Sequence, residues 1–135
     1  MLAETLKKNR DFQEVYKKGK SYANKYLVMY ILKNELNCNR IGISVSKKVG
    51  NSVVRHRTTR LIRESFRLKN ESFLEGFDIV VIARASAKGK KYQDICSALL
   101  HLGKIHKIKR NREEDVEWKK ESLFYYKDIE NIFHL

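Results

Sequence analysis

Residues 76–84 (GFDIVVIAR) restrict the fold most, because they hold a continuous apolar run between a glycine and an arginine. A strand with one face in water usually alternates apolar and polar residues, whereas a strand buried on both faces is apolar throughout. The run therefore predicts a strand that other parts of the chain cover on both sides.

Two further segments have strand character. Residues 21–34 (SYANKYLVMYILKN) are rich in aromatic and β-branched residues and predict a long strand. Residues 40–46 (RIGISVS) alternate apolar with small or polar residues and predict another. We expect the intervening ELNCN to be the turn of a hairpin that joins the two.

Helical periodicity appears at both ends of this region. In residues 9–18, Phe12, Val15 and Tyr16 share one face, and Gly19 is placed to end the helix. In residues 91–109 an apolar stripe recurs at helical spacing, made of Tyr92, Ile95, Cys96, Leu99, Gly103 and His106. With the central helix described below, the expected order is helix, two or three strands, helix, strand, helix. This order predicts a single-domain α+β sandwich, αβββαβα-like, with helices packed on one sheet.

The chain contains no proline and no low-complexity linker, so we expect one domain over residues 1–110. Residues 111–135 form an acidic extension that we expect to be helical or partly disordered. Cys38 and Cys96 do not form a CxxC pair, which favours buried thiols in a reducing compartment. No apolar run is long enough for a membrane span, and the N-terminus lacks the apolar core of a signal peptide. We therefore expect a cytoplasmic protein.

Charge indicates the kind of partner. The 29 basic and 16 acidic residues give a formal net charge of +13. Residues 1–110 carry +16 and residues 111–135 carry −3. A domain this basic attracts a polyanion, because neutralising phosphates releases their condensed counterions. A nucleic acid is the favoured partner, and an anionic membrane is the weaker alternative because neither terminus is a strongly amphipathic basic segment.

Within residues 47–69 (KKVGNSVVRHRTTRLIRESFRLK) the basic residues follow a helical pattern. After Gly50, Asn51 or Ser52 can cap a helix. One side of that helix is apolar or small: Val54, Thr58, Leu61, Ile62, Ser65, Phe66 and Leu68. The opposite arc holds His56, Arg57, Arg60, Arg63 and Arg67, interrupted by Glu64, with Arg55 at the edge. Seven bases against one acid between Lys47 and Arg67 predict a phosphate-binding face, because a merely solvated face interleaves the two charges.

The string KKVGNSVVRHRTTRLIRESFR resembles the signature of the bacterial ribonuclease P protein family, K-K-x-G-x-A-V-x-R-N-R-x-K-R-x-x-R-x-x-F. The upstream DFQEVYKKG resembles the N-terminal helix of that family, and the similarity spans roughly residues 6–109. His56 replaces the asparagine of the RNR triplet and Thr59 replaces a lysine. The acidic extension has no counterpart in the pattern.

The resemblance implies a sandwich with a left-handed βαβ crossover, the ribosomal protein S5 domain 2-like fold. It also implies a non-catalytic subunit of an endoribonuclease whose RNA subunit removes the 5′ leader of precursor tRNA with bound Mg²⁺. The protein would carry no cofactor or metal of its own and would be monomeric before it meets the RNA. The implied contacts to the RNA subunit are Lys47, Lys48, Asn51, Arg55, His56, Arg57, Arg60, Arg63 and Arg67. The implied contacts to the single-stranded leader are Phe12, Tyr16, Val28, Tyr30 and Arg55.

Two other functions remain open from the residues alone. A ribosomal or RNA-assembly protein could use the same sheet and basic helix without taking part in cleavage. A DNA-binding regulator could place residues 52–69 in a major groove, but a strand rather than a second helix precedes them. A protein nuclease is disfavoured because no acid, base or metal cluster is visible, and the spacing of His101 and His106 does not suit metal ligation.

Overall fold

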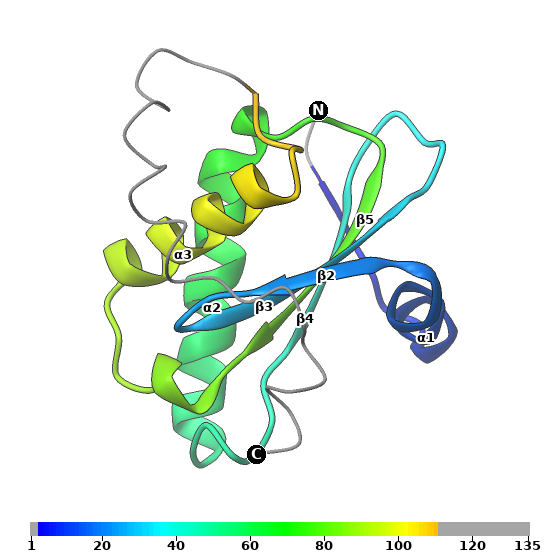
Figure 1. The fold of residues 1–135 in the computed structure, drawn as a ribbon. Coiled ribbons are helices and arrows are strands. Elements are labelled where there is room, and N and C mark those ends of the chain that lie inside the picture. The colour runs from blue at the N-terminus through cyan, green and yellow to red at the C-terminus, as the bar shows by residue number, and fades with distance from the viewer. Residues whose placement is uncertain (1–2, 111–135) are drawn as a thin grey trace.

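The computed structural model describes residues 3–110, which form one five-stranded mixed sheet and three α-helices (Figure 1). The elements follow in the order β1 (Glu4–Thr5), α1 (Asn9–Lys18), β2 (Lys20–Ala23), β3 (Leu27–Lys33), β4 (Arg40–Ser44), α2 (Ser52–Lys69), β5 (Phe77–Ala83) and α3 (Tyr92–Ile105). Short 3₁₀ turns lie at Asn70–Ser72 and Ala85–Ala87. The predicted α+β class and element order are confirmed, with β1 added at the front.

The helices divide between the two faces of the sheet. Figure 1 shows α1 on one side and α2 with α3 on the other, which gives three layers. The larger core lies between the sheet and the α2–α3 layer and includes Met29, Ile79, Ile62 and Leu99. A smaller apolar cluster around Val15 and Val80 joins α1 to the opposite face.

The apolar run of residues 76–84 forms β5, the central strand. The strand order is β1-β4-β5-β3-β2, so β5 pairs with β4 on one side and with β3 on the other. Its alternate residues enter different cores, Ile79 and Val81 on the α2–α3 side and Val80 on the α1 side. The prediction of a strand covered on both faces is confirmed. Strands β4 and β5 are parallel and are connected through α2, as the βαβ crossover requires.

The long strand predicted over residues 21–34 is wrong in one respect, because the segment folds into the antiparallel hairpin β2–β3. Asn24 interrupts it. Its buried side-chain oxygen accepts hydrogen bonds from the backbone N–H groups of Tyr26 and Leu27, at 3.3 and 3.1 Å. An asparagine that bonds its own following backbone forms a turn, and this turn outweighs the strand propensity on either side.

The predicted hairpin at ELNCN is also wrong, because β5 inserts between β3 and β4. The connection crosses the end of β5 instead, where the Asn34 side chain donates to Asp78 Oδ1 at 2.9 Å and the Asn39 side chain accepts from the Phe77 N–H at 2.9 Å. Strand β1 was not predicted. It has two exposed residues and pairs in parallel with the free edge of β4. Its local sequence has no strand pattern, so the sequence did not reveal it.

Smaller differences concern the ends of the helices. Leu68, predicted on the apolar stripe of α2, is 53% exposed because it projects from the last turn on nearly the opposite side from buried Phe66. Helix α3 ends at Ile105 rather than at residue 109. The predictions for the acidic extension lie outside the described residues. Among residues 3–110 no helix has the length and apolar character to cross a membrane, and Cys38 and Cys96 are free and buried, as expected.

Candidate nucleic-acid interface

Helix α2 is held to the sheet by its inward side and capped at its start. The Asn51 side chain accepts a hydrogen bond from the Val54 N–H at 3.0 Å, so Asn51, one of the two predicted candidates, is the N-cap. Thr58, Ile62, Ser65 and Phe66 are buried. The two buried hydroxyls donate to backbone carbonyls one turn earlier, so neither leaves an unsatisfied polar group in the core.

The basic arc of α2 faces away from the sheet. The structure confirms this orientation, because the side chains that the sequence placed on the arc are exposed: His56, Arg57, Arg60, Arg63 and Arg67. The single acid on this arc, Glu64, forms an ion pair with Arg67 at 2.5 Å. Both side chains are about half exposed, so solvent screens the pair and Arg67 remains accessible to a phosphate.

The turn before α2 adds charge to the start of the helix. Lys47 and Lys48 are exposed, and buried Val49 anchors the turn between them and Asn51. The first turn of α2 contains no acidic residue. Unpaired N–H groups at a helix start attract phosphate, so the two lysines reinforce a region that already favours anions.

Arg55 occupies the edge of the basic arc, as predicted. It is half-buried, and its Nε is buried with no hydrogen-bond partner among residues 3–110. With Val45, His56, Arg60 and Arg63 it lines a hollow of about 400 Å³ between the end of β4 and α2. Arg55, Arg60 and Arg63 therefore place positive charge around this hollow.

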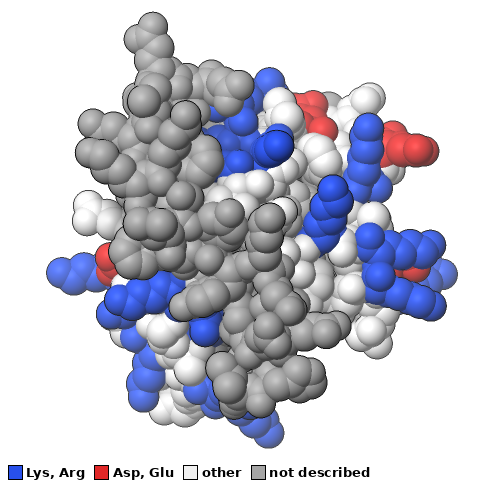
Figure 2. Space-filling view, viewed as in Figure 1, with Lys and Arg blue, Asp and Glu red and all other residues white. Residues whose placement is uncertain are grey.

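Sequence reasoning missed a basic loop next to α2. Residues 84–91 carry Arg84, Lys88, Lys90 and Lys91 without an acid. Arg57 Nη1 donates to the Lys90 carbonyl oxygen at 3.2 Å, which ties this loop to the basic arc. The run RASAKGKK could have been recognised by charge, but its position beside Arg57 depends on the packing of α3. Figure 2 shows lysine and arginine side chains around the outline of the visible face, with acidic side chains in small separate patches.

Four of the five residues implied for the leader gather on the face of the sheet that α1 covers, and the fifth, Arg55, lies on α2. Phe12 and Tyr16 project from α1, and Tyr30 from β3. The rings of Phe12 and Tyr16 are 6.4 Å apart between centroids, and those of Tyr16 and Tyr30 are 5.0 Å apart. All three are partly exposed, whereas Val28 is fully buried against Tyr30 and Ile82. The structure thus brings the three aromatic residues together, and places Arg55 on α2.

Burial changes the chemistry of Tyr16. Burial, with a smaller contribution from Tyr30, raises the pKa of the Tyr16 phenol above its usual value, while a hydrogen bond with Ser44 opposes the rise. The phenol is therefore neutral at physiological pH, so the ring can stack on a base without repelling phosphate. The Phe12 ring lies over Gly42, where a Cβ atom would come within 2.6 Å of it.

Comparison with known proteins agrees with this geometry. The family model for ribonuclease P matches residues 2–107. The ribonuclease P protein component of Lachnoclostridium phytofermentans is 62% identical over 114 residues, 84% of this chain and 98% of the relative. That of Clostridium botulinum (strain Langeland) is 52% identical over 103 residues, 76% of this chain and 93% of the relative.

Solved structures show the same fold. The RNase P protein of Staphylococcus aureus superposes with a TM-score of 0.73 at 46% identity, covering 80% of this chain and 99% of that one. The RNase P protein of Thermotoga maritima gives 0.69 at 37% identity, covering 76% and 96%. The chain belongs to the ribonuclease P protein family. Members of this family are the protein component of a ribonucleoprotein that processes tRNA.

Proposed function

We propose that this chain binds the RNA subunit of ribonuclease P through the outer arc of α2 and holds the single-stranded 5′ leader of precursor tRNA against the aromatic face formed by Phe12, Tyr16 and Tyr30. The RNA subunit, with its own bound Mg²⁺, would supply the hydrolysis. The protein would act in the cytoplasm, and would be a monomer until it meets the RNA.

The observation that carries the first half is the orientation of α2. Arg57, Arg60 and Arg63 are all exposed on one side of a helix whose other side is fixed in the core. Planar guanidinium groups bind phosphate oxygens in pairs and stack on bases. A row of them fixed along a helix can contact several phosphates of a folded RNA at once, and such sequence-independent contacts supply a large share of the affinity.

The leader contact is supported by the chemistry of the opposite face. Every base has a flat π-face, so aromatic side chains hold single-stranded RNA with little demand on sequence. Leaders differ between tRNA genes, and a stacking surface tolerates such differences. Because α1 and α2 cover opposite faces of the sheet, one protein can hold the leader on one side and the RNA subunit on the other.

Two groups that could act as protein catalysts, Asp78 and His106, are engaged in structural contacts. Asp78 is bound by Arg40 and Asn34, and the Nε2 of half-buried His106 donates to the Met29 carbonyl oxygen at 2.9 Å. These contacts favour a role in folding for both residues. They fit the proposal that the protein positions RNA and leaves the chemistry to the RNA subunit.

Reconstitution tests the proposed function. The protein is mixed with a bacterial ribonuclease P RNA at a Mg²⁺ concentration too low for the RNA to act well alone, and release of the 5′ leader is followed under single-turnover conditions. The proposal predicts faster cleavage and tighter binding of precursor tRNA. If the protein binds the RNA without increasing cleavage or substrate affinity, a role in RNA assembly replaces the proposed one.

A further inference from the structure

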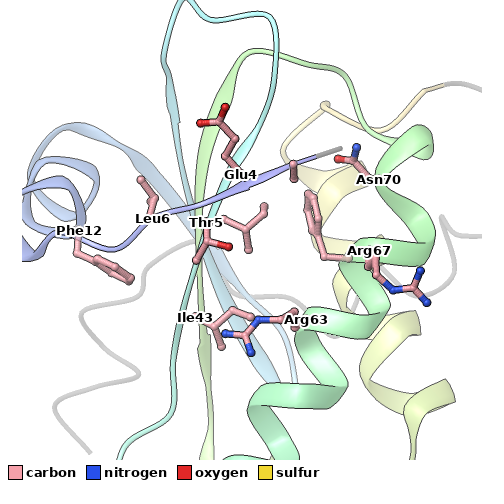
Figure 3. A pocket seen from close by; sticks show the side chains of 11 residues that line it. Glu4, Thr5, Leu6, Phe12, Ile43, Arg63, Arg67 and Asn70 are labelled. Atoms are coloured by element: carbon pink, nitrogen blue, oxygen red, sulfur yellow. The ribbon is translucent and has the colours of Figure 1, made fainter. Parts of the chain in front are cut away.

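A second concave site lies at the β1 edge of the sheet, and it shares Phe12 with the aromatic face described above. It is a pocket of about 400 Å³ between β1, β4 and the C-terminal half of α2 (Figure 3). Its walls are mostly apolar and come from Leu6, Phe12, Ile41, Ile43 and Phe66. Its polar lining includes Thr5, Asn70, Arg63 and Arg67.

The pocket follows from the short length of β1. Strand β1 ends at Thr5, whereas β4 continues to Ser44. Ile43 is therefore only partly covered, while the hydrogen bond from the Leu6 N–H to the Ile41 carbonyl at 2.8 Å holds the chain at the edge of the opening. On the helix side, Phe66 is buried and stacks on Phe73 with centroids 5.0 Å apart. The walls are thus fixed before any ligand arrives.

Charge is distributed unequally around the opening. Arg63 and Arg67 are exposed on the α2 side, and Arg63 has no ion pair among residues 3–110. Glu4, on β1, lines the opposite side of the opening. Figure 3 shows the Glu4 carboxylate pointing away from the two arginines. An entering ligand therefore meets apolar walls with positive charge on one side.

We propose that this pocket receives one unpaired nucleotide of an RNA, with the base between the apolar walls and its phosphate on Arg63 and Arg67. The inference rests on the proposed function, which supplies an RNA partner. The volume lies in the range of small-ligand sites. Proteins that recognise single-stranded RNA take unstacked bases onto aromatic and arginine side chains. Thr5 and Asn70 place polar atoms where they can reach a base edge.

Other ligands fit less well. A base pair within a helix cannot enter, because stacking covers the faces of its bases and pairing occupies their Watson–Crick edges. A phosphate alone would not use the apolar walls, and an apolar peptide side chain would not use the two arginines. The nucleotide can come from the RNA subunit or from the substrate, since both present the same chemistry, and the experiment separates the two sources.

The test fills the pocket without removing a charge. Thr5→Trp places an indole at an exposed strand position that lines the pocket, and Asn37→Trp places the same group in the exposed β3–β4 loop. Binding of each variant to the RNA subunit is measured first. Binding of precursor and mature tRNA to each reconstituted holoenzyme follows. Loss of one stacked base predicts a weakening of roughly 5- to 100-fold for Thr5→Trp alone.

The affected assay identifies the source. Weaker binding of the RNA subunit assigns the nucleotide to that RNA, and weaker binding of precursor tRNA assigns it to the substrate. If Thr5→Trp matches Asn37→Trp in every assay while Arg57→Ala weakens RNA binding, the pocket inference is overturned and the proposed function stands. If Arg57→Ala also has no effect and cleavage is not enhanced, the proposed function fails as well.

A titration of the unaltered protein provides a measurement independent of variant folding. AMP should shift the methyl NMR signals of Ile41 and Ile43 in a saturable manner, and ribose 5-phosphate, which lacks the base, should not. Equal shifts with both compounds would reduce the site to a phosphate contact and contradict the nucleotide pocket. The absence of any methyl shift with AMP would contradict it too.

Discussion

The rings of Tyr16 and Tyr30 meet edge to face, with centroids 5.0 Å apart and planes inclined at 75°. The contact joins α1 to β3 on the face of the sheet that α1 covers, so two residues 14 positions apart form one surface. Edge-to-face packing leaves ring surface available to a third aromatic group. This pair is the centre of the surface that we assign to the leader.

Removing either ring should reduce the preference for precursor over mature tRNA. We expect Tyr16→Ala or Tyr30→Ala to weaken precursor binding to the holoenzyme by about 1 to 3 kcal/mol, the cost of a lost base stack. Tyr16→Phe and Tyr30→Phe keep the rings and serve as matched controls. Equal losses for precursor and mature tRNA would remove the two tyrosines from the leader site.

Arginines on the outer arc of α2 should act through phosphate. Arg60→Ala is expected to weaken binding to the RNA subunit and to lower the slope of log K against log salt by about one. Arg57→Ala should do the same, with a further effect on the loop that it holds through the Lys90 carbonyl. Lys33→Ala removes an exposed charge from the end of β3 and should leave the slope unchanged. An unchanged slope for Arg60→Ala would show that this arginine does not bind phosphate.

An ion pair between neighbouring strands should matter for stability. Arg40 Nε and Nη2 donate to the two carboxylate oxygens of Asp78, at 2.7 and 2.5 Å, and the Asp78 side chain is only 7% exposed. Asp78→Asn leaves the guanidinium without its partner and should lower the free energy of unfolding by about 2 to 4 kcal/mol. Urea unfolding measures this loss. The double variant with Arg40→Gln should recover part of it, and additive losses would show that the two residues are not coupled.

His106 should make stability depend on pH. Its pKa falls from 6.5 to about 4, mainly because of burial; the hydrogen bond with the Met29 carbonyl opposes the fall, and nearby Lys20 contributes to it. The folded state therefore binds its proton less readily than the unfolded state. The contribution of neutral His106 to the free energy of unfolding is fully present above about pH 6.5 and falls as the pH decreases towards 4. Below pH 4 it changes no further, and the total loss is about 3 kcal/mol. His106→Gln cannot titrate, so its stability should be flatter than that of the parent between pH 6.5 and 4; parallel curves would contradict the assignment.

Patterns that depend on neighbours in sequence predicted most of the architecture. The unbroken apolar run of β5, the periodicity of α1 and the two-sided pattern of α2 are local signals that burial imposes directly on the sequence. The cap at Asn51 and the outward orientation of Arg57, Arg60 and Arg63 follow from the same periodicity, and the structure confirms them.

The features that sequence reasoning missed depend on contacts distant in sequence. Asn24 is one polar residue in an apolar stretch, and its turn is reinforced by a hydrogen bond from its side chain to Ala98, 74 positions away. Strand β1 exists because β4 has a free edge, and the β1-edge pocket exists because β1 is short. Because β5 pairs between β3 and β4, the other edge of β4 is left free to pair with β1. The local composition of residues 3–6 indicates none of this.

The difference that the protein makes to the binding of precursor and mature tRNA tests the central claim most directly. Dissociation constants for both substrates are measured with the RNA subunit alone and with the RNA subunit plus protein, with Ca²⁺ in place of Mg²⁺ to slow cleavage. If the protein holds the single-stranded leader, it should tighten binding of precursor tRNA by roughly tenfold or more and leave that of mature tRNA nearly unchanged. Equal tightening of both substrates, or of neither, would contradict the account.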